Sequence, residues 1–156
     1  MDTQTLIATL EASPDIIVGL VREVPPQNLK RRPAPNKWSA HEHACHLTTG
    51  DALCLSRLEL MLSDALPHIM SVLPSPDEEA GSLLNVDLDE ALSRYVRERA
   101  QVVKRLKGLT VEDWQRTAEH EEYSHYSVFI MFRHLLMHEM LHAYRIEELM
   151  LKKDWE

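Results

Sequence analysis

A chain of 156 residues, 44% apolar and 27% charged, has the size and composition of one globular domain with its own hydrophobic core. Its net charge of −8 at pH 7 argues against nucleic acid as a partner, and no apolar run reaches the ~18–20 residues that span a bilayer. The first residues lack the cationic and continuous apolar regions of a secretory signal, so we expect residues 1–156 to form a single cytoplasmic domain.

Few glycines and few alternating β-branched runs favour a helical protein. We predict a short helical lead-in over residues 4–11. Ser13 and Pro14 then occupy the N-cap and first position of a new helix, with Asp15 beside its positive end. That helix presents apolar residues at helical spacing, and the four prolines of residues 25–37 predict a loop after it.

The second predicted helix has a sharply defined start. Ser39 is its N-cap and Glu42 stands three residues later, which is the pattern of a capping box. Apolar residues at helical spacing continue this helix to about Ser63. Residues 64–86 are long for a connection and hold three prolines, and long loops of this kind often cover functional sites.

The third predicted helix begins near residues 87–89 and ends near Gly108, a residue suited to terminating a helix. Thr110 then caps one further short turn. Residues 115–127 are polar and are predicted to form a loop.

The last predicted helix starts at Ser124 or Ser127 and runs to about Lys152. The sum is an all-α protein, an antiparallel four-helix bundle with a long connection between helices two and three. Bundles of this kind place metal ligands on the inward faces of their helices.

The last helix carries the sequence HEMLH at residues 138–142, which has the H-E-x-x-H spacing of zinc metalloproteases. His138 and His142 share one helix face and lie in the middle of its apolar stripe. Two buried imidazoles need hydrogen-bond partners or a metal, because an unsatisfied buried polar group costs roughly 1–3 kcal/mol. The spacing fits both a pair of hydrogen-bonded core histidines and a pair of metal ligands.

A metalloprotease would take its third ligand from residues after this motif. The extended signature requires a glycine at position 145 and a histidine at position 148, where this chain has Arg145 and Glu148. Most of the residues after His142 extend the same helix, and an all-helical chain offers no strand to align a peptide. A peptidase is therefore not expected, and a third ligand has to come from upstream.

The second helix offers three histidines in the sequence HEHACHL. His41 and His43 lie in its first turn, where capping and solvent dominate. His46 lies deeper in the helix beside the apolar stripe, at a depth suited to meeting His138 and His142 across the bundle. Spacing alone favours His46 and leaves the other two open.

Two long segments resemble the DinB-like (DinB/YfiT) family of metal-binding four-helix proteins. The sequence PAPNKWSAHEHACHLTTGDALCLSRLELML looks like the family's proline-containing loop, its WS pair, and its histidine followed by leucine. HLLMHEMLHAYRIEELM is similar to the closing segment with two histidines four apart. The resemblance covers nearly the whole chain, and it implies a three-histidine metal site formed by His46, His138 and His142 with one position open.

The resemblance also implies a metal-dependent enzyme of the thiol-dependent S-transferase or isomerase type, or of the hydrolase type. Imidazole ligands suit zinc and nickel best, and iron, copper and manganese are further candidates. A small molecule is the expected substrate, with a low-molecular-weight thiol as candidate cosubstrate. The alternative is a non-catalytic metal- or ligand-binding helical module, and a homodimer is a further expectation.

Five further side chains are candidates for lining the pocket or supporting the ligands: Trp38, Arg57, His134, Glu139 and Arg145. Trp38 is expected to be an apolar plug at the entrance of the second helix, with a place at the pocket edge as the alternative. Glu139 is offset by about 100° from its neighbouring histidines, so we expect a supporting or solvent residue, with a general base as the alternative. The two arginines suit a carboxylate or phosphate, or pair with an internal acid, among them Glu42, Glu59 and Glu148.

Overall fold

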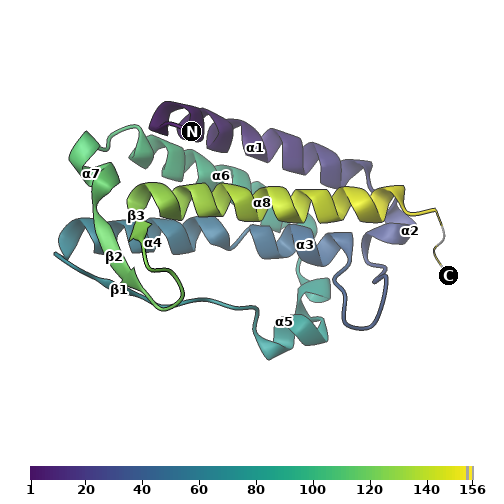
Figure 1. Cartoon of the computed structure of the whole chain (residues 1–156). Helices are drawn as coiled ribbons and strands as arrows, with labels where there is room; N and C mark the ends of the chain where they lie inside the picture. Colours follow the sequence, from purple (N-terminus) through teal and green to yellow (C-terminus); the bar gives the residue numbers. More distant parts are fainter. Residues whose placement is uncertain (154, 156) are drawn as a thin grey trace.

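The computed structural model describes residues 1–153 and 155 and shows four long helical rods packed side by side (Figure 1). The rods are α1 (Thr3–Glu23), the consecutive pair α3 (Ala40–Leu47) and α4 (Gly50–Ser63), α6 (Leu88–Leu106), and α8 (Val128–Leu151). The connections hold the short helices α2 (Pro26–Leu29), α5 (Pro76–Ala80) and α7 (Val111–Gln115) and the 3-10 turn η1 (Ser82–Asn85). The predicted all-α four-helix bundle is confirmed.

The long connection between the second and third rods runs back along the bundle (Figure 1). Helix α6 therefore begins at the same end as α3, and α1 and α8 run antiparallel to both. The connection carries α5 and η1, and η1 packs against α3. It thus covers the end of the bundle where the histidines of α3 lie.

Helix α1 is one continuous helix, not a lead-in followed by a second start. Pro14 lies inside it and has no N–H, so the carbonyl of Leu10 loses its usual partner one turn later. The hydroxyl of Ser13 and Nη1 of Arg99 both lie 3.1 Å from this oxygen and act as replacement donors. The predicted helix start at Ser13 is wrong, because neighbouring side chains compensate for the missing backbone bond.

The second rod begins as predicted and is then interrupted. Ser39 caps α3 in the expected capping box. At the end of α3 the hydroxyls of Thr48 and Thr49 donate to backbone carbonyls three residues earlier, at 2.7 and 2.9 Å. These local bonds compete with helix propagation, so α3 and α4 replace the single predicted helix. The break leaves His46 in the last turn of α3.

The later helices start where the sequence predicts, with Asp87, Thr110 and Ser127 as the N-caps of α6, α7 and α8. The segment predicted as loop before α8 instead contains two strands, β2 (Thr117–His120) and β3 (Tyr126–Ser127). With β1 (His68–Ile69) they form a small sheet of order β1-β2-β3, parallel in its first pair and antiparallel in its second. The loop prediction was wrong because the pairing with β1 is non-local.

The apolar faces of the rods meet in a core at each end of the bundle. One cluster is built around Leu58, Leu106 and Phe132, and the other around Tyr95 and Ile146. Among the described residues, α1 is long and apolar enough to cross a membrane by length and composition alone. Here it packs against α6 and α8, and its apolar side contributes the buried side chains of Leu6, Leu10, Ile17 and Val21.

Candidate metal centre

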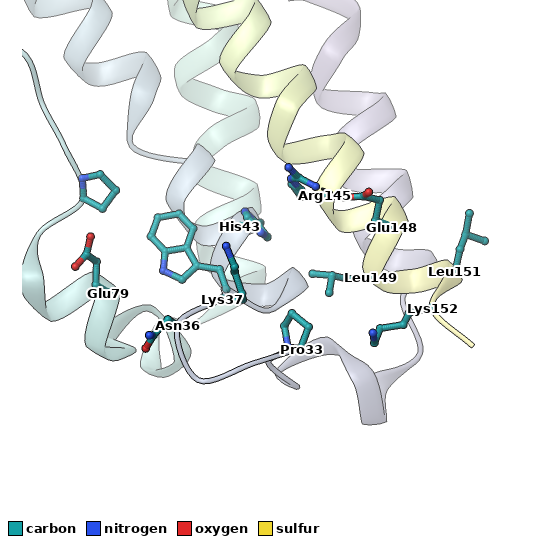
Figure 2. Close-up of a pocket in the computed structure, with 12 residues that line it drawn as sticks. Pro33, Asn36, Lys37, His43, Glu79, Arg145, Glu148, Leu149, Leu151 and Lys152 are labelled. Carbon is teal, nitrogen blue, oxygen red and sulfur yellow. Dashed lines mark hydrogen bonds and ion pairs between the residues drawn. The ribbon is translucent and has the colours of Figure 1, made fainter. Parts of the chain in front are cut away.

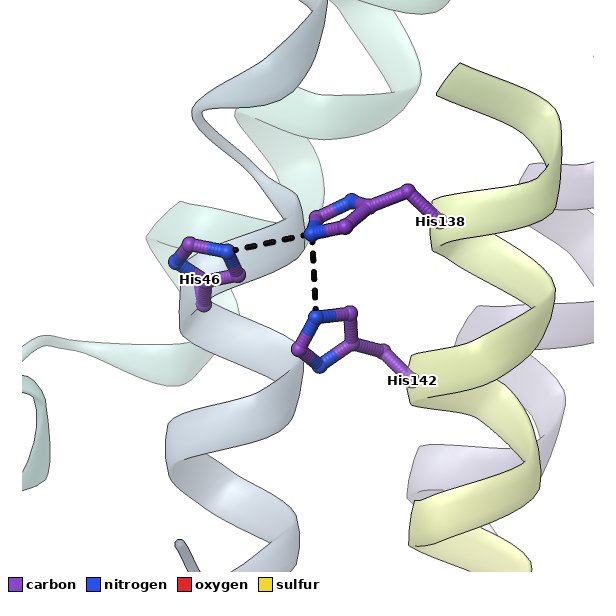
Figure 3. A group of neighbouring side chains, drawn as sticks. All are labelled: His46, His138 and His142. Atoms are coloured by element: carbon purple, nitrogen blue, oxygen red, sulfur yellow. Dashed lines mark hydrogen bonds between the residues drawn. The ribbon is translucent and has the colours of Figure 1, made fainter. Parts of the chain in front are cut away.

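Three histidines converge where α3 faces α8 (Figure 3). His46 comes from the last turn of α3, and His138 and His142 come from one face of α8. Nε2 of His138 lies 3.4 Å from Nε2 of His46 and 3.1 Å from Nε2 of His142. The three ligand atoms all lie within 4.8 Å of one another. The structure therefore brings together the three residues that the sequence and the resemblance selected.

The two Nε2 separations measured from His138 match those of nitrogens that share a metal ion. Three nitrogens bound at about 2.1 Å with tetrahedral angles stand about 3.4 Å apart, close to the two distances above. Burial, with the neighbouring histidines, lowers the pKa of His138 to about 4 and of His142 to about 2, and burial also lowers the pKa of His46. At pH 7 the rings are neutral, so each has a lone pair to offer as a ligand.

The second nitrogen of His142 is held by His43. The two Nδ1 atoms lie 2.8 Å apart, on the side of the His142 ring opposite its Nε2. His43 therefore contacts one of the three histidines and is not part of the group itself. Sequence reasoning placed His43 in a solvated cap, although it stands three residues before His46 and thus on the same helix face. His41 turns elsewhere: it is buried, with Nε2 3.1 Å from the carbonyl of Leu83.

The second nitrogen of His46 faces the long connection. Its Nδ1 is buried without a hydrogen-bond partner, and the carboxylate of Glu78 on α5 lies 3.9 Å away. Oε2 of Glu78 meanwhile accepts a hydrogen bond from the backbone of Ser75 in the capping box of α5. Sequence reasoning missed Glu78, because nothing local indicates that this part of the connection returns to α3.

Glu139 stands between the two ligands of α8 in the sequence, but its carboxylate points into the bundle. It is 1% exposed, pairs with Arg99, and accepts a hydrogen bond from Tyr95 at 2.9 Å. No hydrogen bond joins it to the three histidines. The expectations that Glu139 faces solvent, lines the pocket or acts as a general base are wrong, since its angular offset on α8 directs it toward α6.

Arg57 and His134 make no hydrogen bond to the three histidines. Arg57 follows His46 by about three helical turns and donates to the carbonyl of Met70 at 2.5 Å. His134 is on the surface, with its ring 5.5 Å from the ring of Tyr123 between centroids. Neither residue supports a ligand, so the expectation of a pocket role for either is wrong.

A cavity of about 1200 Å³ opens beside the histidines, between the loop before α3 and the end of α8 (Figure 2). Trp38 and Arg145, two of the predicted lining residues, are in its wall together with His43. The ring of Trp38 lies 4.8 Å from the ring of His46 between centroids. Arg145 pairs with Glu148 at 2.5 Å, one of the pairings considered from the sequence. The cavity thus adjoins the histidine centre through the rings of Trp38 and His43.

The fold and the site together define a helical bundle with three convergent histidines beside a solvent-accessible cavity. A model of the DinB superfamily matches residues 9–146, and the chain belongs to this superfamily. The resemblance seen in the sequence is thereby confirmed.

A comparison with solved structures finds YfiT from Bacillus subtilis, which is described as a probable metal-dependent hydrolase with an unusual four-helix bundle topology. The two share 18% identity with a TM-score of 0.80, over 94% of this chain and 85% of that chain. At this identity the likeness shows a common fold. A search of curated proteins finds no match.

Proposed function

We propose that the protein is a divalent-metal-dependent enzyme that acts on a small molecule bound in the cavity. The observation that carries the proposal is the pair of Nε2 separations, 3.1 and 3.4 Å, among His46, His138 and His142. Among the described residues, no fourth histidine, cysteine or carboxylate belongs to this group. Three protein ligands with one open position are typical of catalytic sites, whereas structural zinc sites take four.

In such an enzyme the residues around the centre would have different roles. His46, His138 and His142 would hold the ion, with zinc and nickel the best matches to imidazole and iron, copper and manganese further candidates. When bound, a divalent ion supplies Lewis acidity that activates water or a thiol near neutral pH. Trp38 packs against the ring of His46 at the cavity wall.

Hydrolysis is the first candidate reaction, and it is the activity named in the description of YfiT. Thiol-dependent S-transfer or isomerisation is the second. The cavity wall holds three cationic side chains, Lys37, Arg145 and Lys152, and two acidic ones, Glu79 and Glu148, of which Glu148 pairs with Arg145. Lys37 and Lys152 support this second candidate, because a low-molecular-weight thiol of peptide type carries carboxylates that they would bind. Both reactions need a pocket for an organic molecule, which a site that only stores or senses metal does not.

Reloading the metal-free protein tests this proposal. We expect chelator-treated protein to be inactive and to regain turnover with one equivalent of zinc or nickel. The assay would use a panel of ester and amide substrates, and a second panel of electrophiles with and without added thiol. Turnover without thiol supports hydrolysis, and turnover that requires thiol supports transfer. Stoichiometric metal without turnover in either panel would contradict the enzyme proposal and favour a non-catalytic module.

A further inference from the structure

The contact between His43 and His142 restricts which ring nitrogens carry protons. Their Nδ1 atoms lie 2.8 Å apart, so one Nδ1 donates a hydrogen bond and the other accepts it. If His43 donates, the hydrogen of the neutral His142 ring must sit on Nε2, where it points at His138 and blocks coordination. If His142 donates, its Nε2 keeps a lone pair directed at the other two histidines.

We propose that His43 is a positioning residue that accepts the Nδ1–H of His142 and so fixes the tautomer and ring orientation in which His142 binds metal. The inference rests on the proposed metal site. Metal-binding histidines commonly give their second nitrogen's hydrogen to an acceptor that orients the ring, and losing that acceptor weakens metal binding by about 10–100-fold. Here the acceptor is an imidazole instead of the usual carboxylate or carbonyl.

The surroundings of His43 hold its ring in place for this role. Trp38 packs edge-on against it, with ring centroids 5.5 Å apart at an interplanar angle of 72°. His43 and His46 stand three residues apart on α3, so one short helix supplies both a ligand and the partner of another ligand. His43 also lines the cavity, and the ring that orients His142 is therefore part of the substrate pocket's wall.

Nδ1 of His46, unlike Nδ1 of His142, is not held by a hydrogen bond. Nδ1 of His46 has no hydrogen-bond partner, and the nearest carboxylate, that of Glu78, is 3.9 Å away. For His142 the supporting contact is already formed in the structure at hydrogen-bond distance. Loss of His43 should therefore act on His142 directly.

Three variants separate hydrogen bonding from packing. His43→Phe keeps an aromatic ring against Trp38 and removes the acceptor. His43→Asn places its Oδ1 where Nδ1 of the imidazole stands, because both atoms are bonded to Cγ, and so retains an acceptor. His134→Phe is the matched control, since it removes an exposed histidine from α8 by the same substitution.

Zinc affinity of each variant is measured by competition with a chromophoric chelator, and folding of the metal-free form by urea denaturation. We expect His43→Phe to bind zinc about 10–100-fold more weakly than wild type, with His43→Asn within roughly 5-fold and His134→Phe unchanged. In the zinc-loaded wild type, long-range ¹H–¹⁵N NMR should show His142 protonated at Nδ1 with Nε2 bound. That Nδ1–H should exchange faster with water in His43→Phe.

Three results would overturn the role of His43: wild-type affinity in His43→Phe, equal weakening in the Phe and Asn variants, or a His142 ring protonated at Nε2 in the zinc-loaded protein. Absence of zinc binding by the wild type would overturn the proposed metal site as well. Normal binding by the wild type together with an unaffected His43→Phe overturns only the inference about His43.

Discussion

Replacing His46 with alanine is expected to abolish stoichiometric metal binding. The change removes the one ligand that α3 contributes and leaves the two histidines of α8. A ligand present at 1,000 times its dissociation constant stabilises a folded protein by about 4 kcal/mol. We therefore expect zinc to raise the melting temperature of the wild type strongly and to leave that of His46→Ala almost unchanged. Thermal unfolding with and without zinc, together with elemental analysis after gel filtration, measures both effects.

The matched control for this change is His125→Ala, which removes an exposed histidine outside the three-histidine group. It should keep one equivalent of metal and the full thermal shift. The melting temperature of metal-free His46→Ala tests whether the substitution damages the fold itself. If a folded His46→Ala variant retained one equivalent of metal, His46 would not be a ligand, and the proposed contribution of α3 to the site would be contradicted.

Replacing Arg99 with methionine is expected to destabilise the fold by about 3–5 kcal/mol. Arg99 is 2% exposed and lies between two buried carboxylates, with Nε 2.8 Å from Asp51 and Nη2 paired with Glu139. Nη1 also donates a hydrogen bond to the carbonyl of Leu10, which lacks its usual helical partner because Pro14 has no N–H. Without the guanidinium, two buried acids lose their counter-charge at once. Urea unfolding measures the loss.

Arg105→Met is the control for removing an arginine from the same helix. Arg105 pairs with Glu59 at 2.7 Å, but both side chains are well exposed, and such pairs contribute about 0–1 kcal/mol. We expect a loss several times smaller than that of Arg99→Met. Equal losses for the two variants would mean that the buried network adds nothing beyond a surface ion pair.

Local signals in the sequence were enough to place most helix starts. Ser39, Asp87 and Thr110 each have the side chain and the neighbours of an N-cap, and each caps a helix in the structure. The predicted helix start at Ser13 was wrong because Pro14 is accommodated inside α1. Arg99, which is distant in sequence, donates a hydrogen bond to the carbonyl to which Pro14 cannot donate. The small sheet was missed because its strands are only two to four residues long and because β1 pairs with β2 from a distant segment.

In the site, too, local sequence patterns predicted some residues, while others depend on contacts between distant segments. The spacing of His138 and His142 placed both on one inward face of α8, and the family resemblance selected His46 as their partner. The positions of His43 beside His142 and of Glu78 near His46 were missed, since one residue lies beside a helix cap and the other in a long connection. These positions depend on tertiary contacts, which neither periodicity nor spacing encodes.

Arg99 is an instructive omission. It stands four residues after Tyr95 and three before Val102, and therefore on the apolar face of α6. A charged residue in that position requires buried partners, and those partners, Asp51 and Glu139, come from α4 and α8. The periodicity of α6 thus contained a signal for a buried ion-pair network, although not for the identity of its acids.

X-ray absorption spectroscopy of the wild-type protein loaded with zinc or nickel tests the central claim most directly. The structure predicts one ion per chain, with three imidazole nitrogens at about 2.0–2.1 Å and at least one further light-atom ligand from solvent. A protein that retains no stoichiometric ion, or an ion with fewer than three imidazoles or with sulfur in its coordination sphere, would contradict the proposed centre.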